Sequence, residues 1–153
     1  MEQRFKLVGK EISDDLVTQL DAQRFPVVVV DAARHIVFIN SAWMVYQVGS
    51  GVPPPYGLGL RYGTPHKRVA SAADNYEQAT VQQGIQEVLE GLQPVFSREC
   101  TIRNALGVIR YRVTATPCTL IGGAIGAILW HEDIGSEGLI LKLVRHKPDP
   151  SKK

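Results

Sequence analysis

The sequence predicts an α+β fold in which helices cover an antiparallel sheet, and three segments carry that prediction. Residues 107–116 alternate apolar and polar side chains with the period of two of a half-buried strand. Residues 122–134 form an apolar run between Gly-Gly and Glu-Asp pairs, too short for a bilayer, which needs about 20 residues. Residues 81–92 repeat apolar side chains at helical spacing. A sheet with one solvated face and one helix-covered face follows.

Composition limits the chain to one core and argues against charged partners. It has 153 residues, of which 44% are hydrophobic and 21% charged, enough for one domain core. The net charge of +2 gives no basic footprint, so neither nucleic acid nor membrane is expected as a partner. The N-terminus lacks an apolar signal segment, which predicts a cytoplasmic location. Two cysteines do not predict a disulfide scaffold.

The first elements expected are a capped helix and a hairpin. Ser13 precedes two aspartates and an apolar stripe, the pattern of an N-cap followed by a favourably charged first turn. The β-branched run 27–30 and the segment 35–40 are separated by a short polar connection, which predicts two paired strands. Asn40 with Ser41 can then cap a helical turn. Glycines and prolines from 49 to 65 predict an irregular loop.

A longer helix is expected next. Asp74 and Glu77 have the spacing of a capping box at its start, and Gly91 supplies its C-terminal stop. Its apolar stripe should cover the sheet.

A second hairpin is predicted after this helix. The strand 94–103 turns at residues 104–107 into the strand 107–116, which sets Cys100 near Tyr111 across the pair. In this register Cys100 and Cys118 lie apart, so both are expected to be reduced.

Six short pieces follow one another along the chain: Phe38-Ile39-Asn40-Ser41-Ala42, Gly84-Ile85, Leu89-Glu90-Gly91, Phe96-Ser97-Arg98-Glu99, Thr116-Pro117 and His131-Glu132-Asp133-Ile134. In their order and spacing they resemble a PAS domain (Per-Arnt-Sim sensory module), most like those of bacterial sensor kinases and cyclases. The resemblance runs from about residue 25 to 135 and implies a five-stranded antiparallel sheet with helices packed on one face around a small cavity. Residues 1–24 would be an N-terminal flanking helix, and 136–153 a C-terminal extension disordered at its tip.

The resemblance assigns signal transmission to Asp133 and Ile134, at the junction to a following helix. Family members usually have threonine after this pair, whereas this chain has Gly135, so the cap lacks a hydroxyl. The chain then either feeds an output domain, as in two-component signalling, or acts in trans on a separate partner.

A ligand site is expected around His131, which stands where flavin-binding members place a glutamine directed at the ligand. The alternative is a core histidine hydrogen-bonded to backbone. An apolar pocket with one polar group would suit a small molecule; the same side chains would otherwise simply form the core. The lining residues implied are Phe38, Trp43, Tyr46, Ile85, Leu89 and Phe96, with Ile125, Ala127 and Leu129 on the strand face of His131.

The cofactor stays unknown from the sequence, and no metal site is predicted. Residues 60–63 read Leu-Arg-Tyr-Gly, without the adduct-forming cysteine of photosensory members. Haem would need an axial histidine, and His66 is the one candidate; beside Lys67 and Arg68 it is better explained as a solvated loop histidine. We therefore expect a colourless protein, with a haem-binding gas or redox sensor as an alternative.

No catalytic motif is found, so the chain is predicted not to be an enzyme. A small α+β cavity enzyme of isomerase or dehydratase type is the other alternative.

A homodimer is expected through an apolar patch. The first helix would contribute Leu16, Val17 and Leu20, and Trp130 should face the outer side of the sheet and complete the patch. The same helix could instead cover only its own sheet.

Overall fold

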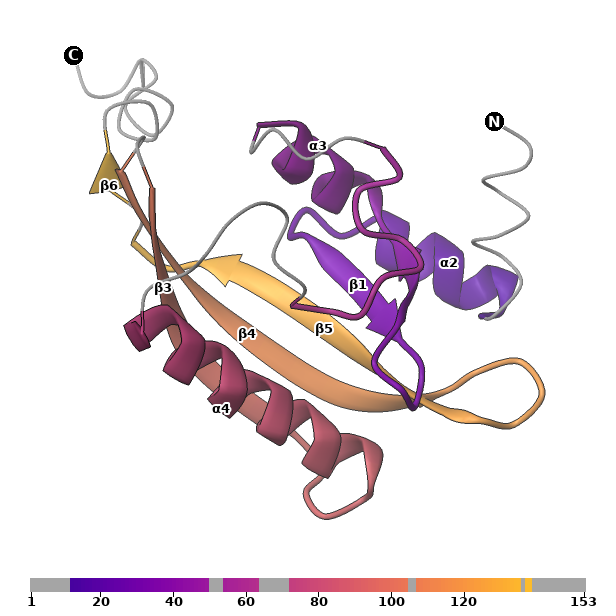
Figure 1. The fold of residues 1–153 in the computed structure, drawn as a ribbon. Helices are drawn as coiled ribbons and strands as arrows, with labels where there is room; N and C mark the ends of the chain where they lie inside the picture. The colour runs from indigo at the N-terminus through magenta and orange to yellow at the C-terminus, as the bar shows by residue number, and fades with distance from the viewer. Residues whose placement is uncertain (1–11, 50–53, 64–71, 105–106, 136, 139–153) are drawn as a thin grey trace.

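The computed structural model describes residues 12–49, 54–63, 72–104, 107–135 and 137–138. Its sheet has the strand order β2-β1-β5-β4-β3, with every neighbouring pair antiparallel (Figure 1). The strands are β1 (Val27–Val30), β2 (Ile36–Ile39), β3 (Phe96–Asn104), β4 (Gly107–Thr119) and β5 (Ile125–Asp133). This confirms the predicted α+β fold of five antiparallel strands.

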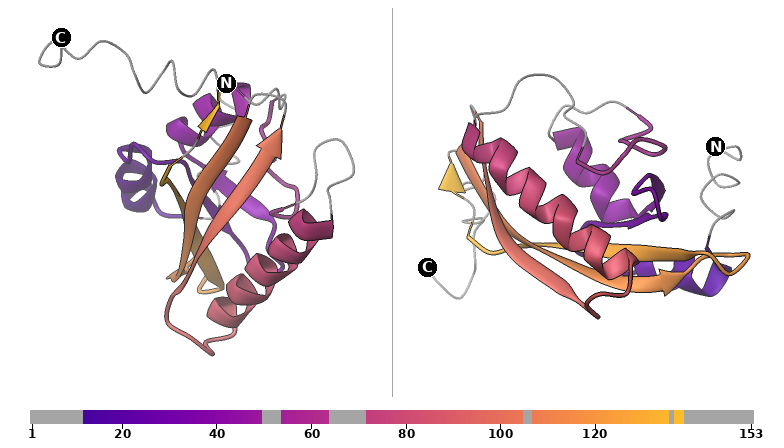
Figure 2. Two further views of the ribbon diagram at one scale, coloured as in Figure 1. Left: turned by 90° about the vertical axis from the view of Figure 1, so that its left-hand side faces the viewer. Right: turned by 60° about the horizontal axis from the view of Figure 1, so that its bottom comes forward.

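The helices of the described residues lie on both faces of this sheet (Figure 2). Helices α3 (Ser41–Gly49) and α4 (Ala72–Leu89) share the inner face, and α2 (Asp14–Asp21) lies on the outer one. None of the described helices is both long and apolar enough to cross a membrane.

Local capping accounts for the ends of α2 and α4. The Ser13 hydroxyl accepts a hydrogen bond from the Leu16 N–H at 3.2 Å, so the predicted N-cap is confirmed. At the C-terminal end of α4, Gly91 has a φ of 77°. The Gly91 N–H donates to the Val88 carbonyl, and the Leu92 N–H donates to the Glu87 carbonyl. This pair of bonds is a Schellman motif, which needs a left-handed residue and so favours glycine.

The hairpin register is the one the sequence predicted. Cys100 pairs with Tyr111 across β3 and β4, and neither Cys100 nor Cys118 forms a disulfide. Strand β4 runs three residues beyond the predicted end, through Pro117. That proline pairs only with Ala127 of β5, because the ladder to β3 has already ended at Ala115, and a proline is tolerated where one side of a strand is unpaired.

Two sequence expectations were wrong in detail. Helix α4 begins at Ala72, so Asp74 lies inside the helix and not at its N-cap. A two-residue strand, β6 (Glu137–Gly138), pairs with the start of β4 and was not predicted. The rest of the predicted C-terminal extension, 136 and 139–153, lies outside the described residues, as do residues 1–11 of the N-terminal flank and His66.

The outer face of the sheet is closed by α2 of the same chain. Leu20 is 1% exposed and packs in one cluster with Val27, Val29 and Phe38, and Trp130 lies against this cluster, as its predicted outward parity requires. The prediction that the flank packs on the open sheet face is confirmed. The hydrophobic surface of α2 is therefore used largely within the chain, and a homodimer through it stays a prediction.

A buried asparagine joins α2, β1 and α3. The Asn40 Oδ1 accepts from the N–H groups of Val27 and Trp43, both at 2.9 Å. Its Nδ2 donates to the carbonyls of Leu20 and Phe25, at 2.9 and 3.0 Å. All four hydrogen-bonding positions of this amide are filled, and the side chain is fully buried. The predicted cap at Asn40 is thus also a tertiary connection.

Candidate functional site

The polar centre of the inner face is His131 on β5. The Nδ1 of its buried ring lies 3.0 Å from the Pro26 carbonyl, and its Nε2 lies 2.6 Å from the Tyr62 hydroxyl. Because a carbonyl can only accept, Nδ1 carries the proton and Nε2 accepts from Tyr62. The hydrogen bonds therefore fix one neutral tautomer of the imidazole.

Burial keeps both members of this pair uncharged near neutral pH. Desolvation lowers the pKa of His131 to about 4, although the bond to Pro26 partly opposes the shift. Burial also raises the pKa of Tyr62 well above its usual range, with Cys100 and Tyr46 adding to the effect. The pair is a neutral donor and acceptor in an apolar interior.

Aromatic rings surround the imidazole. Trp43 of α3 lies with its ring centroid 5.1 Å from that of His131, Tyr62 at 5.7 Å and Tyr111 of β4 at 6.0 Å, all in tilted geometry. Tyr46 contacts Trp43 in turn, with centroids 6.0 Å apart. Tilted rings avoid the face-to-face stacking that aromatic pairs disfavour.

The segment that carries Tyr62 runs along the free edge of β2. Gly59 donates to the Ile36 carbonyl at 2.8 Å, and Ile36 donates back to Leu60 at 2.8 Å. The Trp43 indole N–H donates to the Tyr56 carbonyl at 2.9 Å, which joins the start of the segment to α3. Gln82 of α4 donates to the Tyr62 carbonyl at 2.8 Å. Tyr62 is thus held over His131 by a non-strand segment that α3 and α4 support.

Most of the predicted lining residues meet on this face. Trp43, Ile85, Leu89, Ala127 and Leu129 share one buried cluster, against which Phe96 packs. Tyr46 reaches it through Trp43. Ile125 has the same strand parity but lies at the start of β5, 40% exposed.

Phe38 does not join this group. It pairs with Val29, and both side chains lie in the outer cluster under α2. Strand alternation then places the next residue, Ile39, on the inner face. The ladder shifts register only between Val29 and Val30, which pairs Val30 with Ile36 and lets Ile36 face inward as well. Phe38 is therefore corrected from a lining residue to an outer-face core residue.

Two site residues were missed by the sequence analysis, Tyr62 and Tyr111. Tyr111 alternates in step with Val113 and Ala115, so its inward position could have been inferred from strand parity. Tyr62 had no such signal, because it follows a glycine-rich segment without periodicity and meets a residue 69 positions away.

The predicted signal-transmission residues lie where β5 ends. The Asp133 carboxylate accepts the Gly135 N–H at 3.0 Å, and the Ile134 N–H donates to the Arg110 carbonyl at 3.0 Å. The aspartate thus caps the turn on its own where a threonine hydroxyl is missing. Their part in signalling stays a prediction.

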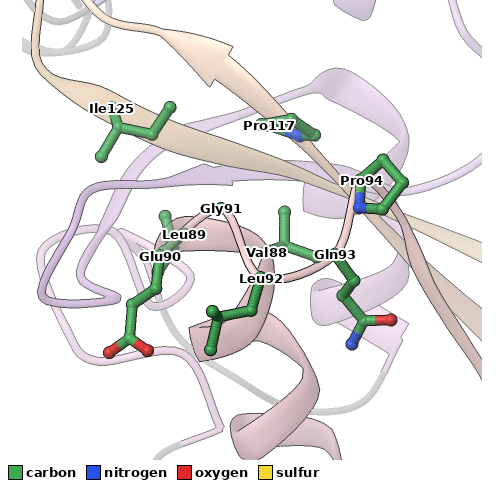
Figure 3. Close-up of a pocket in the computed structure, with 9 residues that line it drawn as sticks. All are labelled: Val88, Leu89, Glu90, Gly91, Leu92, Gln93, Pro94, Pro117 and Ile125. Atoms are coloured by element: carbon green, nitrogen blue, oxygen red, sulfur yellow. The ribbon is translucent and has the colours of Figure 1, made fainter.

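A separate groove lies where α4 ends. It has a volume of about 510 Å³ between the end of α4 and strands β4 and β5 (Figure 3). Ile125 and Pro117 line one side, and Leu92, which is 71% exposed, lies on the other. This groove is open to solvent and does not include His131.

Comparison with solved structures identifies the architecture. The PAS domain of Bordetella pertussis BvgS matches with a TM-score of 0.59 and 16% identity, over 91% of this chain and 96% of that one. The PAS domain of an HTR-like protein from Haloarcula marismortui matches with a TM-score of 0.50 and 15% identity, over 78% and 95%. The chain has a PAS fold. No family model matches the sequence, and no curated protein does.

VqmA proteins also resemble this PAS fold. A phage VqmA in complex with DPO aligns with a TM-score of 0.55 and 19% identity, over 78% of this chain and 51% of that one. The Vibrio cholerae VqmA dimer, whose structure was determined without its target DNA, aligns with a TM-score of 0.57 and 16% identity. The match covers 81% of this chain and 52% of that one. The chain thus spans about half the length of each VqmA chain.

Acidification is expected to destabilise this PAS domain through His131. The pKa of His131 is 6.5 in the unfolded chain, and burial lowers it to about 4 in the folded protein. Between these two pH values the unfolded state therefore binds more protons than the folded state. The stability that depends on neutral His131 is fully present above pH 6.5. The free energy of unfolding falls by roughly 3 kcal/mol as the pH drops toward 4.

Urea unfolding between pH 4 and 7.5 measures this effect. The variant His131→Gln does not titrate, so its stability should fall less over this interval. Parallel pH profiles for the two proteins would show that His131 is not the group responsible.

Proposed function

We propose that this chain is a sensory PAS module that binds a small, largely apolar ligand beside the His131–Tyr62 pair. The observation that supports this most is the neutral His131–Tyr62 pair, an acceptor and a donor, which aromatic rings enclose beside the apolar cluster of the inner face. Ligand sites of soluble proteins combine an apolar lining with a few fixed polar groups in this way. A ligand bound by VqmA, a protein of similar fold, supports the same use of this fold.

Sensing would follow from exchange at the His131 Nε2. A ligand that donates a hydrogen bond competes with the Tyr62 hydroxyl for this acceptor. Displacing Tyr62 moves residues 57–62, which are bonded to β2 and α4 at the protein surface. Occupancy of the interior is thereby converted into a change at the surface, which a partner can detect.

The same pair does not favour an enzyme. General acid–base catalysis at neutral pH needs groups whose pKa values lie near 7. Here burial moves the pKa of His131 down to about 4 and that of Tyr62 upward, away from neutrality on both sides. We therefore propose a binding role, in preference to isomerase or dehydratase chemistry.

Signalling requires a partner, and we propose that this is a second copy of the chain, an output domain or a separate protein. The V. cholerae VqmA dimer supports the first possibility. The contact could use the part of the outer sheet face, on β3, β4 and β5, that α2 does not cover. On this surface Arg112 forms ion pairs with Glu99 and Glu132. Sedimentation velocity at micromolar concentration decides between monomer and dimer.

Tryptophan fluorescence tests the ligand site. The chain has two tryptophans, so Trp130→Phe leaves Trp43, beside His131, as the only reporter. Titration with DPO and a panel of neutral aromatic heterocycles should give saturable quenching with at least one member.

The variants identify the site. His131→Leu removes the acceptor and should weaken binding at least tenfold, about 1.4 kcal/mol. Tyr62→Phe frees Nε2 and should tighten it. The control Arg112→Gln changes an exposed outer-face arginine and should have no effect. Absence of saturation across the panel, or equal affinity in His131→Leu, would contradict the proposal.

A further inference from the structure

The groove at the end of α4 gathers apolar side chains that this chain leaves exposed. Leu92 is 71% exposed and Ile125 40%, and both line the groove together with Pro94 and Pro117 (Figure 3). Val95, the residue after Pro94, is 46% exposed. Soluble monomers rarely group such side chains at one place unless a partner covers them. The groove is therefore a candidate docking surface.

Two carboxylates beside this groove have no cationic partner. Glu90 lines the groove and accepts from the Nε2 of Gln86 at 2.7 Å. Glu87 accepts from Gln93, another lining residue, at 2.8 Å and from Gln83 at 3.0 Å. All three donors are neutral amides, and no ion pair between described residues includes either carboxylate. The rim of the groove is thus negatively charged without compensation.

The chain itself contains a segment with the complementary chemistry. Residues 139–141 are Leu-Ile-Leu and residues 143–144 are Leu-Val, while residue 142 is lysine and residues 145–147 are Arg-His-Lys. Apolar side chains suit the lining of the groove, and the basic ones suit its acidic rim. Charge complementarity of this kind favours one partner and one register over others.

This segment cannot reach the groove of its own chain. Gly138, which precedes it, pairs with Gly107 at the start of β4, and Pro117 lies ten residues further along that strand, about 33 Å away at 3.3 Å per residue. Strand β6 is antiparallel to β4, so the chain passes Gly138 heading away from Pro117 (Figure 1). The six residues from Leu139 to Val144 span at most about 22 Å. An occupant of this sequence must come from another molecule.

We propose that residues 139–147 of one chain dock into the groove at the end of α4 of a second copy. The apolar side chains of the segment would cover Leu92 and Ile125, and the basic ones would lie against Glu87 and Glu90. Two copies that exchange their segments about a two-fold axis fill both grooves and close the assembly as a dimer. This contact is separate from the ligand site at His131 and from the outer face of the sheet, and it depends on neither.

Sedimentation velocity of the full chain over a concentration series tests the contact. Leu92→Glu places a carboxylate in the groove, and Leu143→Glu places one in the segment. Each should weaken the dimer at least tenfold, because the contact would then bury a charge without a partner. Val45→Glu is the matched control, since Val45 is 73% exposed on α3, does not line the groove and should leave the dimer as in wild type. Circular dichroism should show that all three variants are folded.

Mixing the two variants shows whether the contact joins different molecules. Leu92→Glu retains an intact segment and Leu143→Glu an intact groove, so a mixed dimer has one complete contact and either variant alone has none. The mixture should therefore associate at least tenfold more tightly than either variant by itself. Added sodium chloride should weaken the wild-type dimer, because the charges at the rim are exposed to solvent.

Three results would overturn the proposal. A wild-type monomer at every concentration would leave the groove to a different partner. A dimer that neither Leu92→Glu nor Leu143→Glu weakens would use another surface. No gain on mixing the variants would show that the segment and the groove do not meet between two copies.

Discussion

Replacing Asn40 with alanine is expected to lower the free energy of unfolding by about 4 kcal/mol or more. The substitution removes four hydrogen bonds and leaves two N–H groups and two carbonyls without their partner, in or beside the core. A buried polar group left unsatisfied costs roughly 1–3 kcal/mol. The measurement is urea unfolding followed by circular dichroism.

Ser41→Ala is the matched control for this substitution. Ser41 is the next residue, and its side chain bonds to Asp21 at an exposed position. Its loss should cost below about 1 kcal/mol. Similar losses for both variants would mean that the Asn40 amide does not join α2, β1 and α3 as described.

Leu20→Ala is expected to cost about 2–5 kcal/mol, in the range of leucine truncations in well-packed cores. The side chain is 1% exposed between α2 and the outer face of β1 and β2. The same chemical change at Leu92, which is 71% exposed, should stay within about 0.5 kcal/mol.

The comparison of the two leucines also bears on assembly. A small effect at Leu20, accompanied by a change in oligomeric state, would show that α2 leaves its own sheet to cover a partner's. A large effect in a protein of unchanged oligomeric state would place the helix in the intramolecular core, as the structure has it.

Local patterns predicted the elements that local forces determine. The Ser13 cap, the stop at Gly91 and the alignment of Cys100 with Tyr111 each depend on residues within one element or hairpin. Their signals are cap chemistry and side-chain periodicity, which a single sequence displays.

The remaining features depend on contacts between distant segments. No periodicity reveals that Tyr62 meets His131, that two further bonds of Asn40 reach Leu20 and Phe25, or that Phe38 pairs with Val29 on the outer face. The resemblance to PAS domains led to His131 and to most of the inner-face residues. It could not lead to Tyr62, because the position of that side chain is determined by the irregular segment that carries it.

The central claim is that the inner face around His131 holds a small molecule. Native mass spectrometry of protein taken directly from expression tests it most directly, since the measured mass reports ligand and oligomeric state together. The account predicts a single small-molecule adduct per chain on wild type and on Arg112→Gln, and its loss from His131→Leu. A mass equal to that of the bare chain, unchanged after incubation with cell extract, would contradict the claim and leave a module that acts through protein contacts alone.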